Sequence, residues 1–369
     1  MKIAVDAREL AGRPTGVGRY LAELLDSWGE SADARRHEWR LYSPWSISAP
    51  SSLAQRTTLL AGSGGTWWEQ RTLARALSRE RPDVLFAPGY TAPLSAPCPI
   101  VVTIHDVSFA AHPEWFSWHE GRRRRTLTAW SARRARLVLT DSEFSRAEIV
   151  SRLGVPAGKV RAIPLGRPRG QRVMPALAAD QSPREPMILY VGSIFRRRHV
   201  DRLIAAFGTW VAPRLPHARL EIVGENRTHP PQDFGALVAA YPAAIARRIS
   251  FRSYVDEPTI RGLYAGASVF AFPSAYEGFG LTPLEALAAG VAPVVMDTPI
   301  AREIYDAAAR YVPTDLSDPR TLGEPLVELL SSADARAEIL RHGPATLARY
   351  DWDRAAALTL GALEEAALG

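Results

Sequence analysis

Two glutamates, Glu277 and Glu285, stand on either side of a glycine-containing loop. An apolar run at residues 267–272 predicts a strand before the loop, and Gly278 and Gly280 lie within the loop. Glycine lets backbone N–H groups approach a ligand closely, and carboxylates accept hydrogen bonds from hydroxyl groups. The pattern predicts a site for a ligand that is anionic in its middle and rich in hydroxyls at its ends.

A helix is predicted directly after this loop. Thr282 is the expected N-cap, Pro283 the expected first helical residue, and Glu285 completes the Thr-x-x-Glu pattern of a capping box. The unpaired N–H groups and the positive dipole end of such a helix start attract anions. Glu285 therefore has two interpretations: it binds the ligand, or it only stabilises the start of the helix.

Cationic and titratable residues follow two other predicted strands. Residues 196–198, all arginine, come after an apolar run at 187–191, and adjacent arginines can clamp a diphosphate by charge-assisted hydrogen bonds. His105 and Asp106 come after the run at 100–104, where ligands bind in parallel sheets. The alternatives are a solvated basic turn and a structural histidine with Asp106 capping the next turn.

Gly16 and Gly18 follow the first predicted strand, at residues 3–7. A strand, a glycine loop and a helix together are typical of a phosphate- or dinucleotide-binding turn. The full Gly-x-Gly-x-x-Gly pattern is absent, however, because Leu21 stands at the last position. A tight strand-to-helix turn without a ligand is the alternative.

The sequence offers no pattern typical of a metal site. Asp351 and Asp353 have the Asp-x-Asp spacing that a metal-bridged diphosphate would need, but they precede the last predicted helix and are interpreted as caps. Cys98 is the only cysteine, which excludes an internal disulfide and a zinc cluster of thiolates. Arginines and helix starts would then have to neutralise the phosphates, so we predict no metal ion and no other cofactor.

Apolar runs alternate with amphipathic stretches in two successive series. The predicted strands are 3–7, 39–42, 57–60, 84–87, 100–104, 137–140, 160–163, 187–191, 220–223, 249–251, 267–272 and 292–296. The predicted helices include 67–78, 118–134, 143–153, 200–210, 234–247, 257–265, 320–330, 333–342 and 353–368. Continuously apolar strands separated by helices predict parallel sheets covered on both faces.

We therefore expect an α/β fold with two doubly wound, Rossmann-like domains that face a central cleft. The first domain is expected at residues 1–166 and the second at 187–350. Residues 167–186 are rich in Pro, Gly, Arg and Ala without periodicity and are interpreted as a linker. A terminal helix at 351–369 is expected to pack back toward the first domain.

Composition is that of a globular protein with two domains. The 369 residues are 47% hydrophobic and 23% charged, with a formal net charge of +6. No run of eighteen apolar residues is present, and the N-terminus lacks the form of a signal peptide, so we expect a cytoplasmic protein. Between residues 115 and 172, fourteen Arg or Lys stand against four Asp or Glu.

Part of this basic region, residues 115–136, mixes tryptophans with arginines. Such a mixture suits a helix that lies on an anionic membrane surface, near a lipid-linked acceptor. The alternative is a solvated helix whose tryptophans are in the core.

The chain resembles the retaining glycosyltransferases of the GT-B architecture, glycosyltransferase family 4 (glycosyl transferases group 1), and within them mannosyltransferases. The resemblance spans nearly the whole chain. Its most specific part is residues 277–285, with the two glutamates of the family. The other segments that carry it are 15–20, 105–106, 141–145, 163–166 and 190–193.

The resemblance implies that the first domain is the acceptor side and the second domain the nucleotide-sugar donor side. It also implies roles for the residues above. Glu277 and His105 would be the catalytic residues, with Glu277 on the hydroxyls of the donor sugar and His105 near that sugar. Glu285 would bind the ribose. The other donor-binding residues that it implies are Gly16, Gly18, Arg197, Arg198, Gly278, Phe279, Gly280 and Leu281. Arg198 departs from the usual lysine of the family, and His199 stands where asparagine is frequent.

The reaction implied is transfer of a hexosyl unit from a nucleotide-diphosphate sugar, most readily a GDP- or UDP-sugar, to a hydroxyl of a glycan, lipid-linked or small-molecule acceptor. It would serve bacterial surface polysaccharide or glycolipid synthesis. Two alternatives remain open: a nucleotide-sugar epimerase of the same architecture, and an arginine-rich nucleic-acid-binding protein. We expect no nucleic-acid partner, because the glutamate pair would repel a phosphate backbone.

Overall fold

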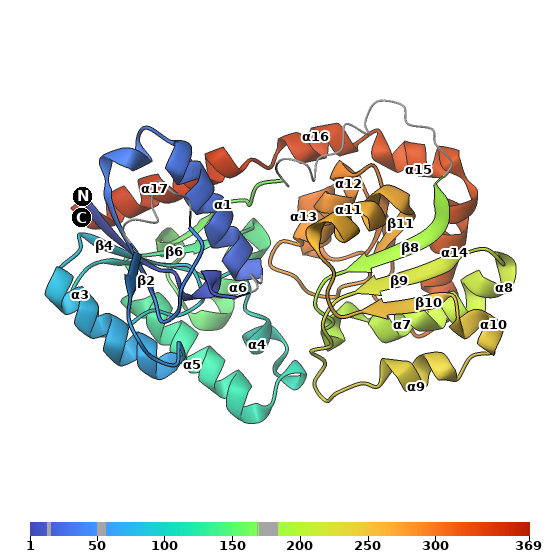
Figure 1. The fold of residues 1–369 in the computed structure, drawn as a ribbon, viewed down its shortest axis with the longest axis horizontal. Coiled ribbons are helices and arrows are strands. Elements are labelled where there is room, and N and C mark those ends of the chain that lie inside the picture. The colour runs from blue at the N-terminus through green and yellow to red at the C-terminus, as the bar shows by residue number, and fades with distance from the viewer. Residues whose placement is uncertain (13–15, 50–56, 168, 170–183) are drawn as a thin grey trace. The chain divides into compact units, whose positions relative to one another are not determined.

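The computed structural model describes residues 1–12, 16–49, 57–167, 169 and 184–369 (Figure 1). The chain forms two compact units, one of Met1–Gly166 with Asp351–Gly369 and one of Arg167–Tyr350. Each unit is built on one sheet, and every strand pair in both sheets is parallel. The predicted α/β fold with two Rossmann-like domains is confirmed.

The first unit contains a seven-stranded sheet in the order β3-β2-β1-β4-β5-β6-β7. Its strands are β1 (Lys2–Asp6), β2 (Glu38–Ser43), β3 (Thr57–Leu59), β4 (Val84–Ala87), β5 (Ile100–Thr103), β6 (Leu137–Thr140) and β7 (Val160–Ala162). The chain first adds strands on one side of β1 and then returns to add β4 on the other side. This reversal point is where ligands bind in doubly wound sheets.

Helices surround this sheet. They are η1 (Arg8–Leu10), α1 (Gly16–Glu30), η2 (Ala34–Arg36), η3 (Trp68–Leu73), α3 (Ala74–Glu80), α4 (Ser108–Ala111), η4 (Pro113–Trp115), α5 (Trp118–Arg134), α6 (Glu143–Leu153), η5 (Ala157–Lys159) and α17 (Trp352–Leu368). The terminal helix α17 belongs to this unit, and the Trp28 indole of α1 donates a hydrogen bond to the Ala356 carbonyl at 2.9 Å. Asp351 caps α17 by accepting a hydrogen bond from the Arg354 N–H.

The second unit contains a six-stranded sheet in the order β10-β9-β8-β11-β12-β13. Its strands are β8 (Glu185–Val191), β9 (Arg219–Val223), β10 (Ile249–Arg252), β11 (Ala267–Phe272), β12 (Ala292–Met296) and β13 (Arg310–Val312). Here the strand order reverses between β8 and β11. Strand β8 begins at Glu185, inside the predicted linker, most of which lies outside the described residues.

The helices of the second unit are more broken than the sequence predicts. They are η7 (Arg196–Arg198), α7 (Val200–Ala206), η8 (Phe207–Val211), α8 (Ala212–Arg214), α9 (Phe234–Ala239), α10 (Ala243–Ala246), α11 (Glu257–Gly266), α12 (Leu281–Ala288), α13 (Pro299–Tyr305), α14 (Pro319–Ser331), α15 (Ala333–Leu340) and α16 (Gly343–Ala348). The prediction of one helix at 234–247 is wrong. Pro242 has no N–H and separates α9 from α10.

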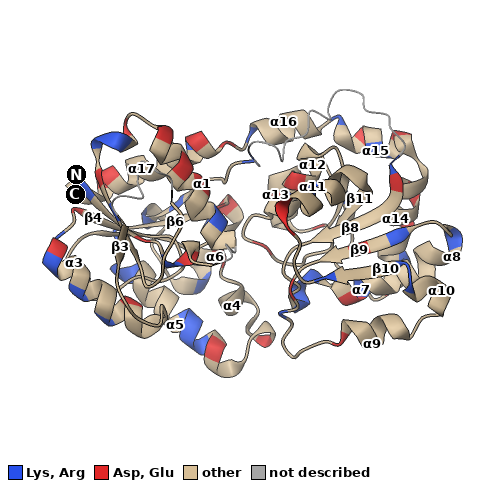
Figure 2. Ribbon diagram, viewed as in Figure 1, with Lys and Arg blue, Asp and Glu red and all other residues tan. Residues whose placement is uncertain are grey.

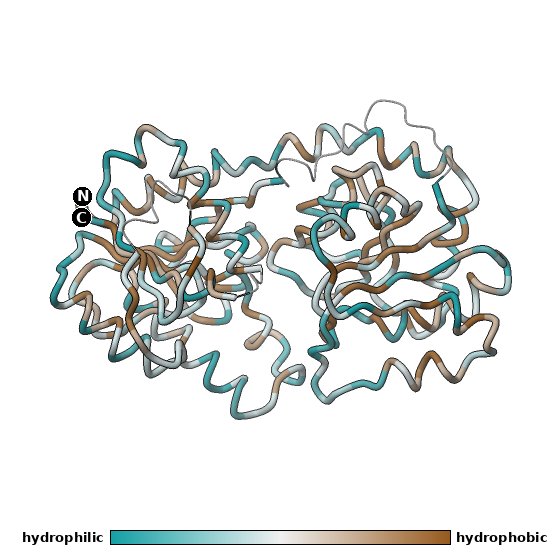
Figure 3. Tube along the Cα trace, in the orientation of Figure 1, coloured by the Kyte–Doolittle hydropathy of each residue, from teal (hydrophilic) through white to brown (hydrophobic). Residues whose placement is uncertain are grey.

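The strands of both sheets are among the most hydrophobic parts of the chain (Figure 3). Every residue of β4, β5, β6, β11 and β12 is buried. Burial of apolar surface contributes about 25 cal/mol per Å² and stabilises each sheet beneath its helices. The polar loops at the carboxyl ends of the strands are thereby held on a rigid support.

Candidate functional site

Arg198 and Glu277 form an ion pair at the carboxyl ends of β8 and β11. These two strands are parallel neighbours, so the loops that follow them meet at one edge of the sheet. Arg198 Nε donates to Glu277 Oε1 at 2.7 Å, and Arg198 Nη2 donates to Oε2 at 3.0 Å. The side chains are only 14% and 13% exposed. The structure thus brings two predicted site residues together, in a bidentate pair that the sequence did not predict.

Further contacts hold this pair in place. The Ser274 hydroxyl donates to Glu277 Oε1 at 2.8 Å, and Arg198 Nη1 donates to the Ser193 carbonyl at 2.9 Å. Burial disfavours the charged form of Glu277, but the guanidinium groups of Arg198 and Arg197 outweigh it and lower the pKa of the carboxyl. Glu277 is therefore an ionised carboxylate whose two oxygens are already hydrogen-bonded, an arrangement that suits orientation of a ligand.

Arg197 and His199 flank Arg198 in the same turn. Arg197 Nε donates to the Tyr276 carbonyl at 3.1 Å, and its guanidinium lies 4.5 Å from the centre of the Phe195 ring. His199 adopts a left-handed conformation, with φ of 45° and ψ of 41°. Asparagine and histidine are both among the non-glycine residues enriched in this conformation, so His199 suits a position where the family often has asparagine.

The start of α12 differs from the prediction. Gly280 is the N-cap, with φ of 90°, and the helix begins at Leu281. The Thr282 cap is therefore wrong: the left-handed glycine turns the backbone into the helix earlier than the threonine would. The Tyr305 hydroxyl donates to the Gly280 carbonyl at 2.7 Å, and a Cβ on Gly280 would lie 2.2 Å from that hydroxyl.

The other predicted donor-binding residues of this loop lie directly before or at the start of α12. Gly278 and Phe279 are buried, and Gly280 and Leu281 are partly exposed. The Phe279 ring packs edge-on against Tyr350, with ring centres 5.2 Å apart. The loop is thus anchored at Phe279.

Glu285 lies in the second turn of α12 and is 7% exposed. Its Oε2 accepts a hydrogen bond from the Tyr264 hydroxyl of α11 at 3.0 Å. The capping-box interpretation is wrong, because Glu285 is too far from Gly280, the observed N-cap of α12. A buried carboxylate fixed by a neighbouring helix is compatible with ligand binding, and its role on the ribose stays a prediction.

In the first unit, His105 follows β5 and has both ring nitrogens engaged. Nδ1 lies 2.8 Å from Asp141 Oδ2, and Nε2 lies 2.9 Å from the Pro88 carbonyl oxygen. Both partners are acceptors, so a proton on each nitrogen satisfies them best. Burial opposes the charge, but the Asp141 carboxylate outweighs it and raises the pKa of His105. These surroundings favour the protonated form of the His105 ring and hold the ring in one orientation.

Asp106 has the local role that one alternative assigned to it. Its Oδ1 accepts a hydrogen bond from the Ser108 N–H at 2.8 Å, and its Oδ2 accepts one from the Tyr90 hydroxyl at 3.1 Å. Asp106 therefore caps the turn that leads into α4. The edge-on packing of Tyr20 against the His105 ring, with centres 4.9 Å apart, fixes the imidazole further.

We expect His105 to titrate above the ordinary histidine value of about 6.5. A raised pKa in the folded state adds stability that is fully present below the unfolded value and is lost as pH rises through the folded value. As the pH rises from the unfolded pKa of His105 through its folded pKa, the difference in unfolding free energy between wild type and His105→Gln should therefore shrink. Urea denaturation at several pH values and NMR titration of the His105 ring test this. A ring pKa at or below 6.5 would contradict it.

Gly16 and Gly18 lie at the start of α1. Gly16 is exposed, and a Cβ there would meet nothing within 4 Å, whereas Gly18 is buried within the first turn. Residues 13–15 of the predicted loop lie outside the described residues. The contact of these glycines with phosphate or acceptor stays a prediction.

Among the residues that the structure describes, no three His, Cys, Asp or Glu side chains gather in a way that could hold a metal ion. The prediction that the reaction needs no metal is untested. None of the helices within these described residues could span a lipid bilayer.

The chain is similar to known proteins in sequence and in fold. O-antigen chain mannosyltransferase B of Escherichia coli is 27% identical over 271 residues, which are 71% of this chain and 69% of that protein. A glycogen synthase of Mycobacterium tuberculosis is 29% identical over 221 residues, 57% of this chain and 51% of that protein. The solved structure of HepE from Anabaena in complex with UDP-glucose has the same fold, with a TM-score of 0.73, 16% identity, and coverage of 98% of this chain and 100% of that chain.

Two family descriptions cover the chain. Residues 14–168 match the model of "Glycosyltransferase Family 4", and residues 178–344 match that of "Glycosyl transferases group 1". The matches support a glycosyltransferase and not an epimerase. This protein belongs to the group 1 glycosyltransferases with a family 4 N-terminal domain.

Proposed function

We propose that the protein transfers a hexosyl unit from a nucleoside-diphosphate sugar to a glycan hydroxyl during synthesis of a bacterial surface polysaccharide or glycolipid. The observation that carries this proposal is the Arg198–Glu277 pair at the reversal point of the second sheet. A cation for the diphosphate and a carboxylate for the sugar stand side by side there. The similarity to an O-antigen mannosyltransferase supports a mannosyl donor.

Each side chain has a role that its surroundings support. Arg197 and Arg198 stabilise the charge that develops on the departing diphosphate, aided by the N–H groups at the start of α12. Glu277 accepts hydrogen bonds from the sugar hydroxyls, and Glu285 accepts them from the ribose. Positioned charges of this kind supply most of the catalysis, so the reaction proceeds without a metal ion.

The anomeric configuration is retained through attack on the same face as the departing diphosphate, which takes the proton of the acceptor hydroxyl. Glu277 is a poor candidate for a covalent nucleophile, because Arg198 and Ser274 already engage its oxygens. The C–O bond to the diphosphate breaks as the bond to the acceptor oxygen forms. The proton leaves with the nucleoside diphosphate, so atoms and charge balance.

Thermal unfolding with a panel of GDP, UDP, ADP and dTDP, each in the presence of EDTA, tests donor binding. One diphosphate is expected to raise the melting temperature most, because a ligand that binds only the folded state stabilises it by mass action. Arg198→Met should abolish the increase, while Arg75→Met, an exposed arginine of α3 far from the site in sequence, should leave it intact. The absence of any shift in the wild-type protein would contradict the proposed function.

We further propose that the protein binds an anionic membrane surface through the Trp–Arg surface, defined here as Trp67, Trp118, Arg122 and Arg123. The Trp67 and Trp118 indoles are 71% and 68% exposed. The alternative that the tryptophans of residues 115–136 are in the core is wrong for Trp118 and also for Trp130, which is 50% exposed. The Arg122 guanidinium lies 5.3 Å from the Trp118 ring centre, and Arg123 donates to Thr66, next to Trp67. Figure 2 shows the positive residues along α5.

This arrangement joins amphipathic rings, which partition into the headgroup region, to charges that attract anionic lipid. The protein should co-sediment with vesicles containing about 30% phosphatidylglycerol and much less with pure phosphatidylcholine. A Trp67→Ala, Trp118→Ala double variant should lose most of the binding. Tyr254→Ala removes an aromatic side chain of the second unit that is 58% exposed and serves as the control. Equal binding to both kinds of vesicle would contradict the proposed binding to an anionic membrane surface.

A further inference from the structure

Tyr264 is the one buried residue of helix α11, whose ten residues the structure describes in full. Its ring packs against Phe270 of β11, with ring centres 5.8 Å apart. Its hydroxyl reaches Glu285 of α12 and donates to Oε2 at 3.0 Å. An apolar side chain would hold α11 on the sheet equally well, because the burial of apolar surface is sufficient for that. The hydroxyl therefore serves the carboxylate rather than the attachment of the helix.

Arg184, which directly precedes β8, ties the ends of α11 and α12 together. Its Nη1 donates to the Tyr264 carbonyl at 3.3 Å and to the Ala267 carbonyl at 2.9 Å. Its Nη2 donates to the Ala289 carbonyl at 2.9 Å. Ala267 and Ala289 are the C-caps of α11 and α12, where carbonyl groups without a helical partner attract a cation. The two helices are thus held together at their C-terminal ends, and with them Tyr264 and Glu285.

Glu285 is a buried carboxylate with a fixed donor. Glu285 and Tyr264 are each 7% exposed. A buried carboxylate needs hydrogen-bond donors in place of water. Because the Tyr264 hydroxyl holds Glu285, the carboxylate cannot turn to another donor when a ligand lacks a hydroxyl. Sites of this kind discriminate strongly against such a ligand, since their buried polar groups then lose a partner.

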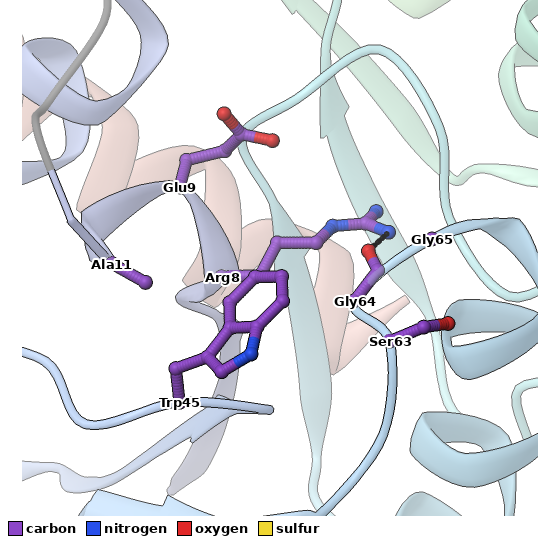
Figure 4. Close-up of a pocket in the computed structure, with 7 residues that line it drawn as sticks. All are labelled: Arg8, Glu9, Ala11, Trp45, Ser63, Gly64 and Gly65. Atoms are coloured by element: carbon purple, nitrogen blue, oxygen red, sulfur yellow. Dashed lines mark hydrogen bonds between the residues drawn. The ribbon is translucent and has the colours of Figure 1, made fainter.

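The first unit has an open pocket of about 330 Å³, which Figure 4 shows with Arg8 and Glu9 in its wall. Arg8 Nη2 lies 2.9 Å from Asp6 Oδ2 and also pairs with Glu69, so one guanidinium stands against three carboxyl groups. Burial raises the pKa of Asp6 to about 6, and this group is still mostly ionised at neutral pH. A diphosphate would meet net negative charge here. The pocket is therefore unsuited to the nucleotide, whose recognition we assign to the second unit.

We propose that Tyr264 is a positioning residue that makes the donor site selective for ribose over 2′-deoxyribose, because it holds Glu285 where the carboxylate accepts the ribose hydroxyls. The donor would then be a ribonucleoside diphosphate sugar. Sugars linked to dTDP, which carry 2′-deoxyribose, would be poor donors. The inference rests on the proposed function and adds the class of nucleotide that the site accepts and a residue outside the glutamate pair that sets this choice.

The test is isothermal titration of the full chain with the preferred member of GDP, UDP and ADP and with the 2′-deoxy form of the same compound. The wild type should bind the 2′-deoxy form about tenfold or more weakly, since a hydrogen bond to a charged group contributes at least that factor. Tyr264→Phe keeps the ring against Phe270 and should stay folded. Its Kd for the ribose form should rise toward that for the 2′-deoxy form, which should itself remain nearly unchanged.

Tyr311→Phe is the matched control. The Tyr311 hydroxyl also lies in the second unit, and it donates to the Asp306 carbonyl at 2.7 Å and to the Ala301 carbonyl at 3.2 Å. The loss of this hydroxyl should leave the ratio of the two Kd values as it is in the wild type. Thermal unfolding of both variants without ligand shows that they are folded and measures the structural cost of each substitution separately.

The ratio of the two Kd values separates a positioning role from a structural one. An unchanged ratio in folded Tyr264→Phe would overturn the inference, because a purely structural tyrosine would weaken both ligands alike. Equal binding of the ribose and 2′-deoxy forms by the wild type would also overturn it. Both results would leave the transferase function standing. A wild type that binds none of the nucleoside diphosphates would instead contradict the proposed function.

Discussion

Glu277→Gln is expected to lower the rate of hexosyl transfer by about 100- to 1,000-fold, the range found when one positioned group is removed from a polar active site. The carboxylate accepts hydrogen bonds from Arg198 and Ser274 and is proposed to accept others from the donor sugar. An amide presents an N–H₂ group to the guanidinium in place of one acceptor oxygen. The donor sugar would then lose its alignment, and so would Arg198, the cation proposed to bind the diphosphate. Steady-state rates with saturating donor measure the effect.

The same substitution should lower the unfolding free energy by about 2–4 kcal/mol, because Arg198 keeps its charge in a site that is only 14% exposed. A matched double variant, Glu277→Leu with Arg198→Met, removes both charges and should regain most of this stability without regaining activity. Urea denaturation of the three proteins separates the two effects. Recovery of activity in the double variant would show that the pair is structural only. A hexosyl adduct on Glu277 in intact mass spectra would contradict its orienting role.

Gly280→Ala should weaken nucleoside-diphosphate binding by about tenfold or more and lower the unfolding free energy by about 2–4 kcal/mol. Two costs add together. Alanine at a φ of 90° is strained, and its Cβ would lie 2.2 Å from the hydroxyl of Tyr305, which is 3% exposed and has little room to move. We expect this clash to displace the backbone at position 280 and, with it, the first N–H groups of α12. Isothermal titration with the preferred diphosphate measures the loss.

Two controls divide these costs. Gly154 has a φ of 64° and open space around its Cβ position, so Gly154→Ala measures the strain of a left-handed alanine alone, about 1–2 kcal/mol. Tyr305→Phe removes the clashing hydroxyl and leaves Tyr305 Cζ at an ordinary 3.5 Å from the new Cβ. The Gly280→Ala, Tyr305→Phe double variant should therefore be more stable than Gly280→Ala alone. A double variant that is no more stable would contradict the steric explanation.

Much of the fold followed from the sequence because its strands carry a strong local signal. The continuously apolar β4, β6, β11 and β12 begin and end at the predicted residues, as do α5 and α6. Strand β13 was missed, since three residues at a sheet edge leave little pattern. The break between α9 and α10 was missed because the prediction gave Pro242 too little weight.

The candidate site was less predictable because its contacts join residues that are far apart in the chain. Arg198 and Glu277 are separated by 79 positions, and no local spacing reports that they pair. The Thr282 cap failed for a related reason: the Tyr305 hydroxyl, 25 positions from Gly280, holds the backbone where the left-handed glycine starts α12. Residue types and strand ends could be predicted, but partners chosen by tertiary packing could not.

The central claim is tested most directly by incubating the protein in EDTA with UDP- and GDP-hexoses and a neutral oligosaccharide, and following the reaction by ¹H NMR. The account predicts that one donor is consumed only when the acceptor is present. It also predicts equimolar release of nucleoside diphosphate and a new glycosidic bond with the anomeric configuration of the donor. Conversion of the donor into another nucleotide sugar without acceptor, or a product of inverted configuration, would contradict it.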